Sequence, residues 1–164
     1  MISFEYLNKS DFFAFARQIF DILADNMTVI APTGNSREDD FILWSDAVSD
    51  GLKREERQII LIKDNANLIG FFQYYTNADT FMMEEIQFKS DYQGKGVLRE
   101  LYGFILNNIR NDLKLIEAYA NVNNQKSIGI LEKFGLSNIG LKKNGHSYHF
   151  KGNFVDLFKW FESY

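Results

Sequence analysis

A glycine-bearing turn between a strand and a helix constrains the fold of this chain more than any other feature. Residues 80–88 have the pattern of a strand, the turn Gln93-Gly94-Lys95-Gly96 follows, and a helix with one apolar face starts at Val97. The start of a helix leaves backbone N–H groups without partners and carries about half a positive charge. Such a turn binds phosphate through its backbone, and glycine lets a ligand come close because no Cβ intervenes. The sequence therefore predicts an anion site at this turn.

The turn by itself does not identify its ligand. It is not a P-loop, because no Ser or Thr follows a Gly-Lys pair at the required spacing, and it lacks the third glycine of the dinucleotide fingerprint. Lys95 adds a positive charge that favours a phosphate. An ordinary tight turn between a strand and a helix has the same composition, so a functional assignment needs a second feature.

The second feature is the segment 124–136, which starts 28 residues beyond Gly96. Together the two segments resemble the GNAT superfamily of N-acetyltransferases. Residues 93–98 fit five of the six places of the first motif of that family. The order of the expected elements also agrees with the family fold over nearly the whole chain. The second family motif is matched by Asn124, Ser127, Glu132, Lys133, Gly135 and, nearly, Leu136.

The resemblance implies a site for acetyl-coenzyme A. The strand that ends at Phe88 would run beside the pantetheine arm and pair with it through the backbone. The backbone amides that follow Gln93 would wrap the pyrophosphate, and Asn124 would meet the pantetheine from the next strand's loop, with Ser127 nearby. The residues expected to bind the coenzyme are therefore Ile86, Gln87, Phe88, Gln93, Gly94, Lys95, Gly96, Val97, Leu98, Arg99, Asn124 and Ser127.

Two positions depart from the family pattern. Leu98 replaces the last small residue of the first motif, which is harmless when its side chain faces the core and its amide still donates. Leu131 stands where many members have a tyrosine that protonates the departing thiolate. A thiol with a pKa of about 8.5 is already a tolerable leaving group near neutral pH, so activity without that acid is expected. Tyr119 and Tyr148 are alternative acids from a different direction.

The acceptor amine has to lose a proton before it attacks. About 4–5 kcal/mol separates an amine of pKa near 10.4 from its reactive form at neutral pH, and a carboxylate helps directly or through water. Glu84 and Glu85 lie in the strand 80–88, and adjacent strand residues face opposite sides. Glu84 is the favoured base because it shares parity with Phe88, although a bulge would reverse the choice and a solvated carboxylate is the alternative. The backbone amide of Phe88 is expected to stabilise the developing oxyanion.

The rest of the chain predicts helices that cover a mixed sheet. The fold class is α/β (α+β), with a GNAT-like mixed, mostly antiparallel central sheet of six to seven strands flanked by helices. The 164 residues are expected to form a single GNAT-like domain, 1–164. The expected elements are a strand at 2–7, a helix from the N-cap Ser10 to about Asn26, a helix at 38–52, strands at 58–63, 68–75 and 80–88, a helix at 97–109, a strand at 115–120, a helix at 124–134, strands at 136–141 and 147–150, and a helix at 154–161.

Composition argues against several other functions. The absence of Cys removes disulfides, thiolate catalysis and Cys-based zinc sites, and it fits a reducing compartment. The net charge of −4 makes a nucleic acid an unfavourable partner. No apolar stretch approaches the roughly 18 residues that span a bilayer, and the first residues lack the pattern of a signal peptide, so we expect a cytoplasmic protein that binds no membrane. His146 and His149 face opposite sides of an expected strand, so no metal site is expected.

The predicted function is acetyl-CoA-dependent transfer of an acetyl group to a primary amine of a small molecule or peptide. The alternative is a non-catalytic GNAT-fold module that binds coenzyme A or a partner, and transfer of a longer acyl group is a more distant one. The acidic segment 38–52 either lines an entrance for a cationic amine or forms a solvated helix face. The aromatic tail 154–164 is a candidate cover for a neighbouring subunit in a homodimer, and the sequence does not decide the oligomeric state.

Overall fold

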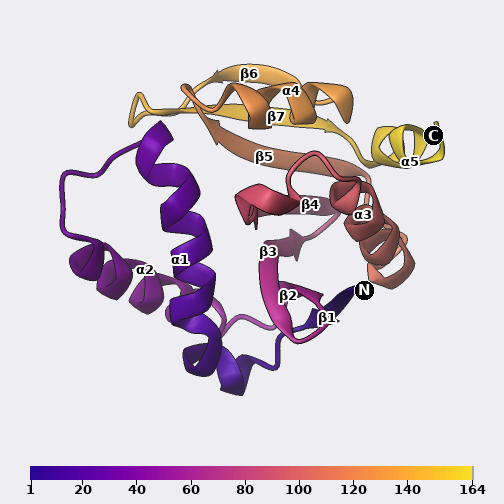
Figure 1. Cartoon of the computed structure of the whole chain (residues 1–164). Coiled ribbons are helices and arrows are strands. Elements are labelled where there is room, and N and C mark those ends of the chain that lie inside the picture. The colour runs from indigo at the N-terminus through magenta and orange to yellow at the C-terminus, as the bar shows by residue number, and fades with distance from the viewer. Residues whose placement is uncertain (164) are drawn as a thin grey trace. The chain divides into compact units, whose positions relative to one another are not determined.

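The computed structural model describes residues 1–163, in which helices and strands follow one another in the predicted order (Figure 1). Two short 3-10 turns at Lys9–Asp11 and Ser90–Tyr92 precede α1 and α3. The elements in chain order are β1 (Ile2–Tyr6), α1 (Phe12–Ile30), α2 (Arg37–Gly51), β2 (Arg57–Asp64), β3 (Asn67–Asn77), β4 (Thr80–Phe88), α3 (Val97–Asn108), β5 (Leu115–Asn121), α4 (Gln125–Lys133), β6 (Ser137–Leu141), β7 (Ser147–Asn153) and α5 (Phe154–Glu162).

The strands form one seven-stranded sheet in the order β1-β2-β3-β4-β5-β7-β6. The pairs β1–β2, β5–β7 and β6–β7 are antiparallel, and β4–β5 is parallel. The predicted fold class, a mixed and mostly antiparallel sheet of six to seven strands flanked by helices, is therefore confirmed.

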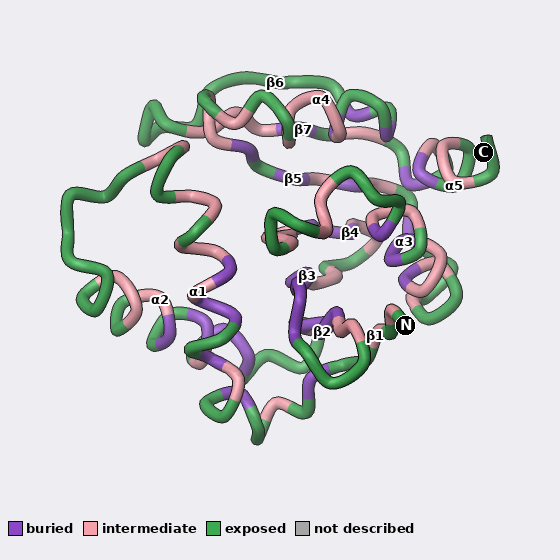
Figure 2. The backbone as a smooth tube through the Cα atoms, in the orientation of Figure 1, coloured by how far each residue is buried: buried purple, intermediate pink, exposed green. Residues whose placement is uncertain are grey.

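The described residues divide into two compact units, and β3 and β4 contribute residues to both. The first unit comprises Met1–Tyr74 and Glu85–Val97. Its core forms where the apolar faces of α1 and α2 pack on β2 and β3, which Figure 2 shows as largely buried. Apolar residues recur at helical spacing in α1, so one stripe of that helix is buried. The buried members of this core are Leu7, Phe12, Ala16, Ile19, Ile22, Val48, Leu52, Ile59, Leu61, Leu68 and Phe71.

The second unit comprises Tyr75–Glu84 and Leu98–Tyr164, of which Tyr164 lies outside the described residues. An aromatic cluster joins α3, α4 and α5, because the ring of Phe134 lies 4.9 Å from that of Tyr102 and 4.6 Å from that of Trp160. The hydroxyl of Tyr102 also donates to the sulfur of Met83 on β4. These helices therefore cover the face of the second unit's strands to which Met83 points.

Two details differ from the sequence predictions. Ser10 does not cap the first helix: it lies in the 3-10 turn, where the side chain of Asn8 accepts from its backbone N–H, and α1 starts after Asp11. Helix α1 also continues to Ile30, because no glycine or proline stops it near Asn26. In the aromatic tail, Phe154 and Leu157 are buried within their own unit whereas Val155 and Phe158 are exposed, so cover of a neighbouring subunit by this segment stays a prediction.

Candidate functional site

The predicted anion-binding turn is a bend at the start of α3 in which both glycines have left-handed backbone conformations. Gly94 has φ +73° and Gly96 has φ +81°, values that side chains other than glycine rarely adopt. A Cβ added at either position would meet no described atom within 4 Å. The bend is thus shaped by its glycines and open on the outside, as a backbone cradle for a diphosphate requires.

A hydrogen bond from Tyr92 fixes the approach to this bend. Its hydroxyl donates to Asp64 Oδ2 at 2.7 Å, at the end of β2, and its backbone N–H donates to the carbonyl of Lys89. The hydrogen bonds from the N-terminal ammonium and from Tyr92 lower the pKa of Asp64, and the bond to Asp64 raises the pKa of Tyr92. The sequence did not predict this contact, because Asp64 and Tyr92 are 28 residues apart.

The end of β4 is fastened to α1 by amide side chains. Asn26 Nδ2 donates to the carbonyl of Phe88 at 2.8 Å and to Gln87 Oε1 at 2.9 Å. Gln93 Nε2 donates to the same Phe88 carbonyl at 3.1 Å. Gln87 in turn donates to Glu85 Oε1 at 2.6 Å. The amide of Phe88 is predicted to stabilise the oxyanion. The carbonyl of the same residue is held by two amide donors, from Asn26 and Gln93.

A close approach between β3 and β4 explains a further glycine. A Cβ added at Gly70 would lie 2.6 Å from the carbonyl oxygen of Gln87 and 2.9 Å from the ring of Phe88. Any larger residue at this position would displace the strand segment that was predicted to run beside pantetheine. Gly70 is thus a structural requirement of the candidate site.

The predicted coenzyme-binding residues fall into both units. Ile86, Gln87, Phe88, Gln93, Gly94, Lys95, Gly96 and Val97 belong to the first unit, whereas Leu98, Arg99, Asn124 and Ser127 belong to the second, as does Glu84. The side chain of Arg99 points to α5, where it donates to the carbonyl of Phe161 at 2.9 Å and covers the Phe161 ring at 4.7 Å. The predicted role of Arg99 at the pyrophosphate therefore depends on its backbone amide.

The second motif forms the start of α4. Asn124 is the N-cap, and its side chain accepts from the backbone N–H of Ser127 at 3.2 Å. Gly135 has φ +87° just after the helix, as its predicted role at the C-terminal end requires. Leu131, at the position of the family tyrosine, is only 8% exposed. It fills the core of the second unit and brings no acid there.

One sheet face of the second unit carries polar side chains. In the register of β4 and β5, Met82 pairs with Glu117, and counting on by two residues puts Glu84 and Tyr119 on the same face. On β7, Tyr119 pairs with His149. His149 Nε2 and Glu117 Oε1 lie 2.7 Å apart, and the His149 ring stacks on Tyr119 with 4.6 Å between ring centroids. The sequence did not predict this cluster, because it placed His149 only as an isolated strand residue.

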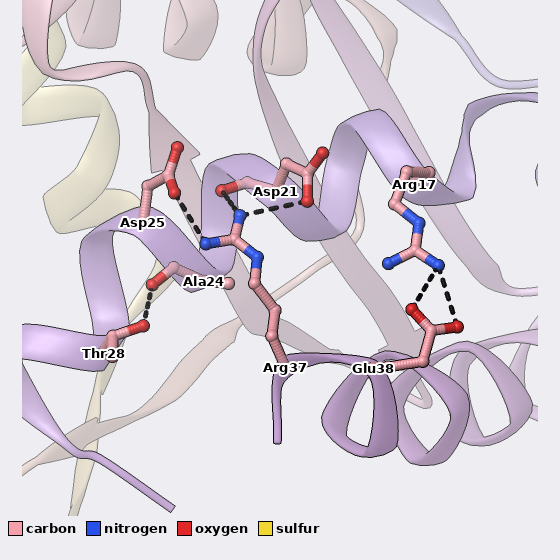
Figure 3. Close-up of polar contacts among 7 residues, drawn as sticks. All are labelled: Arg17, Asp21, Ala24, Asp25, Thr28, Arg37 and Glu38. Carbon is pink, nitrogen blue, oxygen red and sulfur yellow. Dashed lines mark hydrogen bonds and ion pairs between the residues drawn. The ribbon is translucent and has the colours of Figure 1, made fainter. Parts of the chain in front are cut away.

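Helices α1 and α2 are joined by ion pairs (Figure 3). The guanidinium of Arg37, at the start of α2, lies 3.0 Å from carboxylate oxygens of both Asp21 and Asp25 on α1, and Arg17 pairs with Glu38 at 2.8 Å. These bonds raise the pKa of Arg37.

A pocket of about 210 Å³ borders the same stretch of α1. It is lined by Gln18, Asp21, Ile22, Asp25, Leu68 and Lys89.

In the part of the chain that the structure describes, three or more His, Cys, Asp or Glu side chains nowhere gather as metal ligands would. None of the helices over residues 1–163 combines the length and apolar character needed to cross a bilayer.

Several solved structures with the same fold are named as acetyltransferases. An acetyltransferase from Thermus thermophilus superposes with a TM-score of 0.71 at 13% identity, covering 93% of this chain and 97% of the other. The PaiA N-acetyltransferase of Thermoplasma acidophilum in complex with coenzyme A gives 0.70 at 14% identity, covering 94% and 99%. The spermidine/spermine N-acetyltransferase SpeG of Vibrio cholerae gives 0.60 at 18% identity, covering 96% of each chain. At these identities the likeness concerns the fold alone.

Sequence comparison identifies the family. A search of functionally curated proteins finds no similar sequence. The model of the acetyltransferase (GNAT) family matches residues 16–136, which make up well over half of the chain and include the bend, the end of β4 and the start of α4. The chain therefore belongs to the GNAT family of acetyltransferases.

Proposed function

We propose that this protein is an N-acetyltransferase that uses acetyl-CoA as donor and a primary amine of a small molecule or peptide as acceptor. The observation that carries the proposal is the bend at Gly94 and Gly96, which has two left-handed glycines and open space on its outer side. The bend opens the 12-residue helix α3, whose first N–H groups and dipole favour a diphosphate. The coenzyme complex of the PaiA relative supports coenzyme A as the ligand of such a fold.

The residues of this chain have separate roles in the proposed reaction. The backbone of residues 86–88 aligns the pantetheine arm, and the amides from Gly94 to Arg99 hold the pyrophosphate. Asn124 and Ser127 contribute further contacts to the pantetheine. Coenzyme A supplies the acetyl group as a thioester that an amine can attack.

Two groups of β4 assist the proposed chemistry. The amide of Phe88 donates to the oxygen on which negative charge develops, and such preorganised donors are worth about 2.7–4 kcal/mol each. The carboxylate of Glu84 attracts the acceptor ammonium and assists its deprotonation directly or through water. Two amide side chains hold the carbonyl of Phe88, on the C-terminal side of this proposed amide donor, and so fasten the end of β4.

A cationic amine is the acceptor class with most support. The SpeG relative is named for spermidine and spermine, which are amines that carry several positive charges. The net charge of −4 on this chain favours the approach of such an acceptor.

The test is binding of coenzyme A to a pair of glycine variants. Gly94 and Gly145 have nearly equal φ values, +73° and +74°, and an added Cβ meets no described atom within 4 Å at either position. Gly94→Val and Gly145→Val therefore carry matched backbone strain, but only Gly94 lies in the proposed diphosphate cradle. We expect isothermal titration calorimetry to show loss of coenzyme A binding in Gly94→Val and wild-type affinity in Gly145→Val.

The outcomes separate a lost site from a lost fold. Circular dichroism and thermal unfolding should give similar traces for the two variants. A folded Gly94→Val protein with unchanged affinity would refute the placement of the pyrophosphate at the bend. Equal loss of affinity in both variants would point to strain rather than to the cradle.

The second candidate function is a non-catalytic module that binds coenzyme A or a partner. The observation that favours it is Leu131, which is buried where many family members have an acidic hydroxyl. A thiol-release assay with acetyl-CoA and a panel of amines and peptides distinguishes the two. Turnover with any acceptor excludes the purely regulatory role. The same assay with longer acyl-CoA donors tests which size of acyl group the protein transfers.

A further inference from the structure

We propose that His149, held by Glu117, is the catalytic residue that takes the proton from the acceptor amine. This inference rests on the proposed acetyltransferase function and adds a proton acceptor that family membership does not specify. It arises from a contact that joins β5 to β7 within the second unit.

The contact has the geometry of an oriented base. His149 Nε2 lies 2.7 Å from Glu117 Oε1, and the two side chains are 26% and 18% exposed, so they are partly shielded but open to a small molecule. When the imidazole is neutral, Nε2–H donates to the carboxylate, which leaves Nδ1 with a free lone pair. Glu117 thereby fixes the tautomer and stabilises the imidazolium that forms when Nδ1 takes a proton.

Stacking holds the imidazole in place. The rings of His149 and Tyr119 are 4.6 Å apart and inclined by only 23°. Tyr119 is 40% exposed, and Lys142 Nζ lies 4.3 Å from its ring centroid. Lys151 is the register partner of Glu117 on β7. The charged and titratable groups around the imidazole are thus Glu117, Tyr119, Lys142 and Lys151.

The cluster shares a sheet face with the proposed acceptor carboxylate. Counting from the paired residues Met82 and Glu117, Glu84 lies on the face that also carries Tyr119 and His149. The opposite face of β5 is apolar, because Ile116, Ala118 and Ala120 are buried. By this register Tyr119 on β5 lies between Glu84 on β4 and His149 on β7, so the imidazole stands on the polar face, two strands from Glu84.

Imidazole is better suited than a carboxylate to this task. General bases work best when their pKa lies near the operating pH, and imidazole is the side chain whose unperturbed pKa, about 6.5, is closest to neutral. An unperturbed glutamate titrates near 4.3 and is therefore a much weaker base toward an ammonium. In this refinement of the proposed function, Glu84 attracts the ammonium, and His149 rather than Glu84 accepts its proton.

The proton balance of the reaction is complete. An ammonium acceptor loses two protons when it becomes an amide. The first passes to Nδ1 of His149, directly or through one water, and is later released to solvent. The C–N bond then forms, the C–S bond breaks with its electron pair on sulfur, and the second proton neutralises the thiolate.

The test compares two histidine variants. In His149→Gln, the amide Nε2 can still donate to Glu117, but the side chain can no longer accept a proton. His146→Gln is the matched control, because His146 is exposed in the β6–β7 hairpin and lies outside the cluster. With saturating acetyl-CoA and an acceptor on which the wild type turns over, we expect kcat of His149→Gln to fall about 10²- to 10⁴-fold. The affinity for coenzyme A and the unfolding midpoint should stay at wild-type values, and His146→Gln should match the wild type throughout.

A rescue experiment gives a readout that a purely structural role would not produce. Added imidazole should restore part of the rate in His149→Ala by supplying the missing base in solution. A His149→Gln protein that binds coenzyme A and turns over within threefold of the wild type would overturn the assignment while leaving the acetyltransferase function intact. If His149→Ala loses rate and added imidazole restores none of it, the contact between His149 and Glu117 is structural rather than catalytic. A wild type without turnover on any acceptor would remove the proposed function and this inference together.

Discussion

Tyr92 shows how one side chain positions the proposed coenzyme cradle. Its hydroxyl is bonded to Asp64 at 2.7 Å, which fixes the turn that leads into Gln93 and Gly94. Tyr92→Phe removes only this bond, so we expect coenzyme A affinity measured by calorimetry to weaken about two- to fivefold, the effect of one hydrogen bond. The matched control is Tyr6→Phe, which removes the hydroxyl bonded to Tyr74 in the same unit, and it should leave the affinity unchanged. Equal affinities for wild type and Tyr92→Phe would contradict a positioning role.

The same contact predicts a definite pH dependence. The folded pKa of Asp64 is lowered, so its contribution to stability is present above the ordinary carboxyl range, near 3.9, and is lost as pH falls through the lower folded value. The folded pKa of Tyr92 is raised, so its contribution is present below about 10 and is lost as pH rises through the higher folded value. The difference in urea midpoint between wild type and Tyr92→Phe should therefore stay constant from about pH 5 to 9 and shrink outside this window. A difference that varies within the window would show that another group controls the contact.

At the level of residues, the sequence predicts the features that depend only on neighbouring positions in the chain, such as turns and helix ends. The bend glycines and the N-cap Asn124 could be predicted because a turn or a helix end requires such residues at these positions. The pair of Glu117 and His149 could not, since 32 residues separate its members and only the register of β5 with β7 joins them. Asn26 was missed for the same reason, because no local pattern distinguishes it from a surface residue of an amphipathic helix.

At the level of elements, the link between α1 and β4 is a testable part of the site. Asn26→Ala removes the donors to Gln87 and Phe88, so we expect the free energy of unfolding to fall by about 1–2 kcal/mol in urea titrations. Asn108→Ala makes the same exchange in α3, where the amide bonds only to the exposed carbonyl of Phe104, and should change stability by less than about 0.5 kcal/mol. The exchange raises helix propensity in both variants, so the comparison isolates the contacts of Asn26. Equal stability of the two variants would mean that these bonds do not hold the strand end.

Element bounds could be predicted where the sequence contains a clear signal. The strand Thr80–Phe88 has the predicted bounds because a turn at residues 78–79 precedes it and the 3-10 turn Ser90–Tyr92 follows soon after its end. The end of α1 was placed four residues early, since the apolar stripe fades near Asn26 while the backbone continues to Ile30. Its start was misplaced because Asn8 and Ser10 form a local 3-10 turn of their own, a competing use of the same capping chemistry.

At the level of the whole molecule, the chain carries one tryptophan in each compact unit. Trp44 packs against Phe20 on the first unit's core, and Trp160 lies in the aromatic cluster of the second. The sequence contains 2 tryptophans in all, so a single Trp→Phe change leaves a fluorescent probe that reports on one unit. The strands β3 and β4 each supply residues to both units.

Because two strands belong to both units, we expect the chain to unfold as the single domain 1–164. In urea titrations followed by fluorescence, Trp44→Phe and Trp160→Phe should each give a midpoint that coincides with the circular dichroism midpoint of the same variant. Agreement within each variant tests cooperativity, whatever the two substitutions cost in stability. Saturating coenzyme A should then raise the fluorescence midpoint of both variants together, since a ligand that binds only the native state stabilises every part of one cooperative unit. Separate transitions for the probe and the circular dichroism signal would show that the two units unfold independently. A coenzyme effect on one probe alone would show that coenzyme A stabilises only the unit that holds this probe.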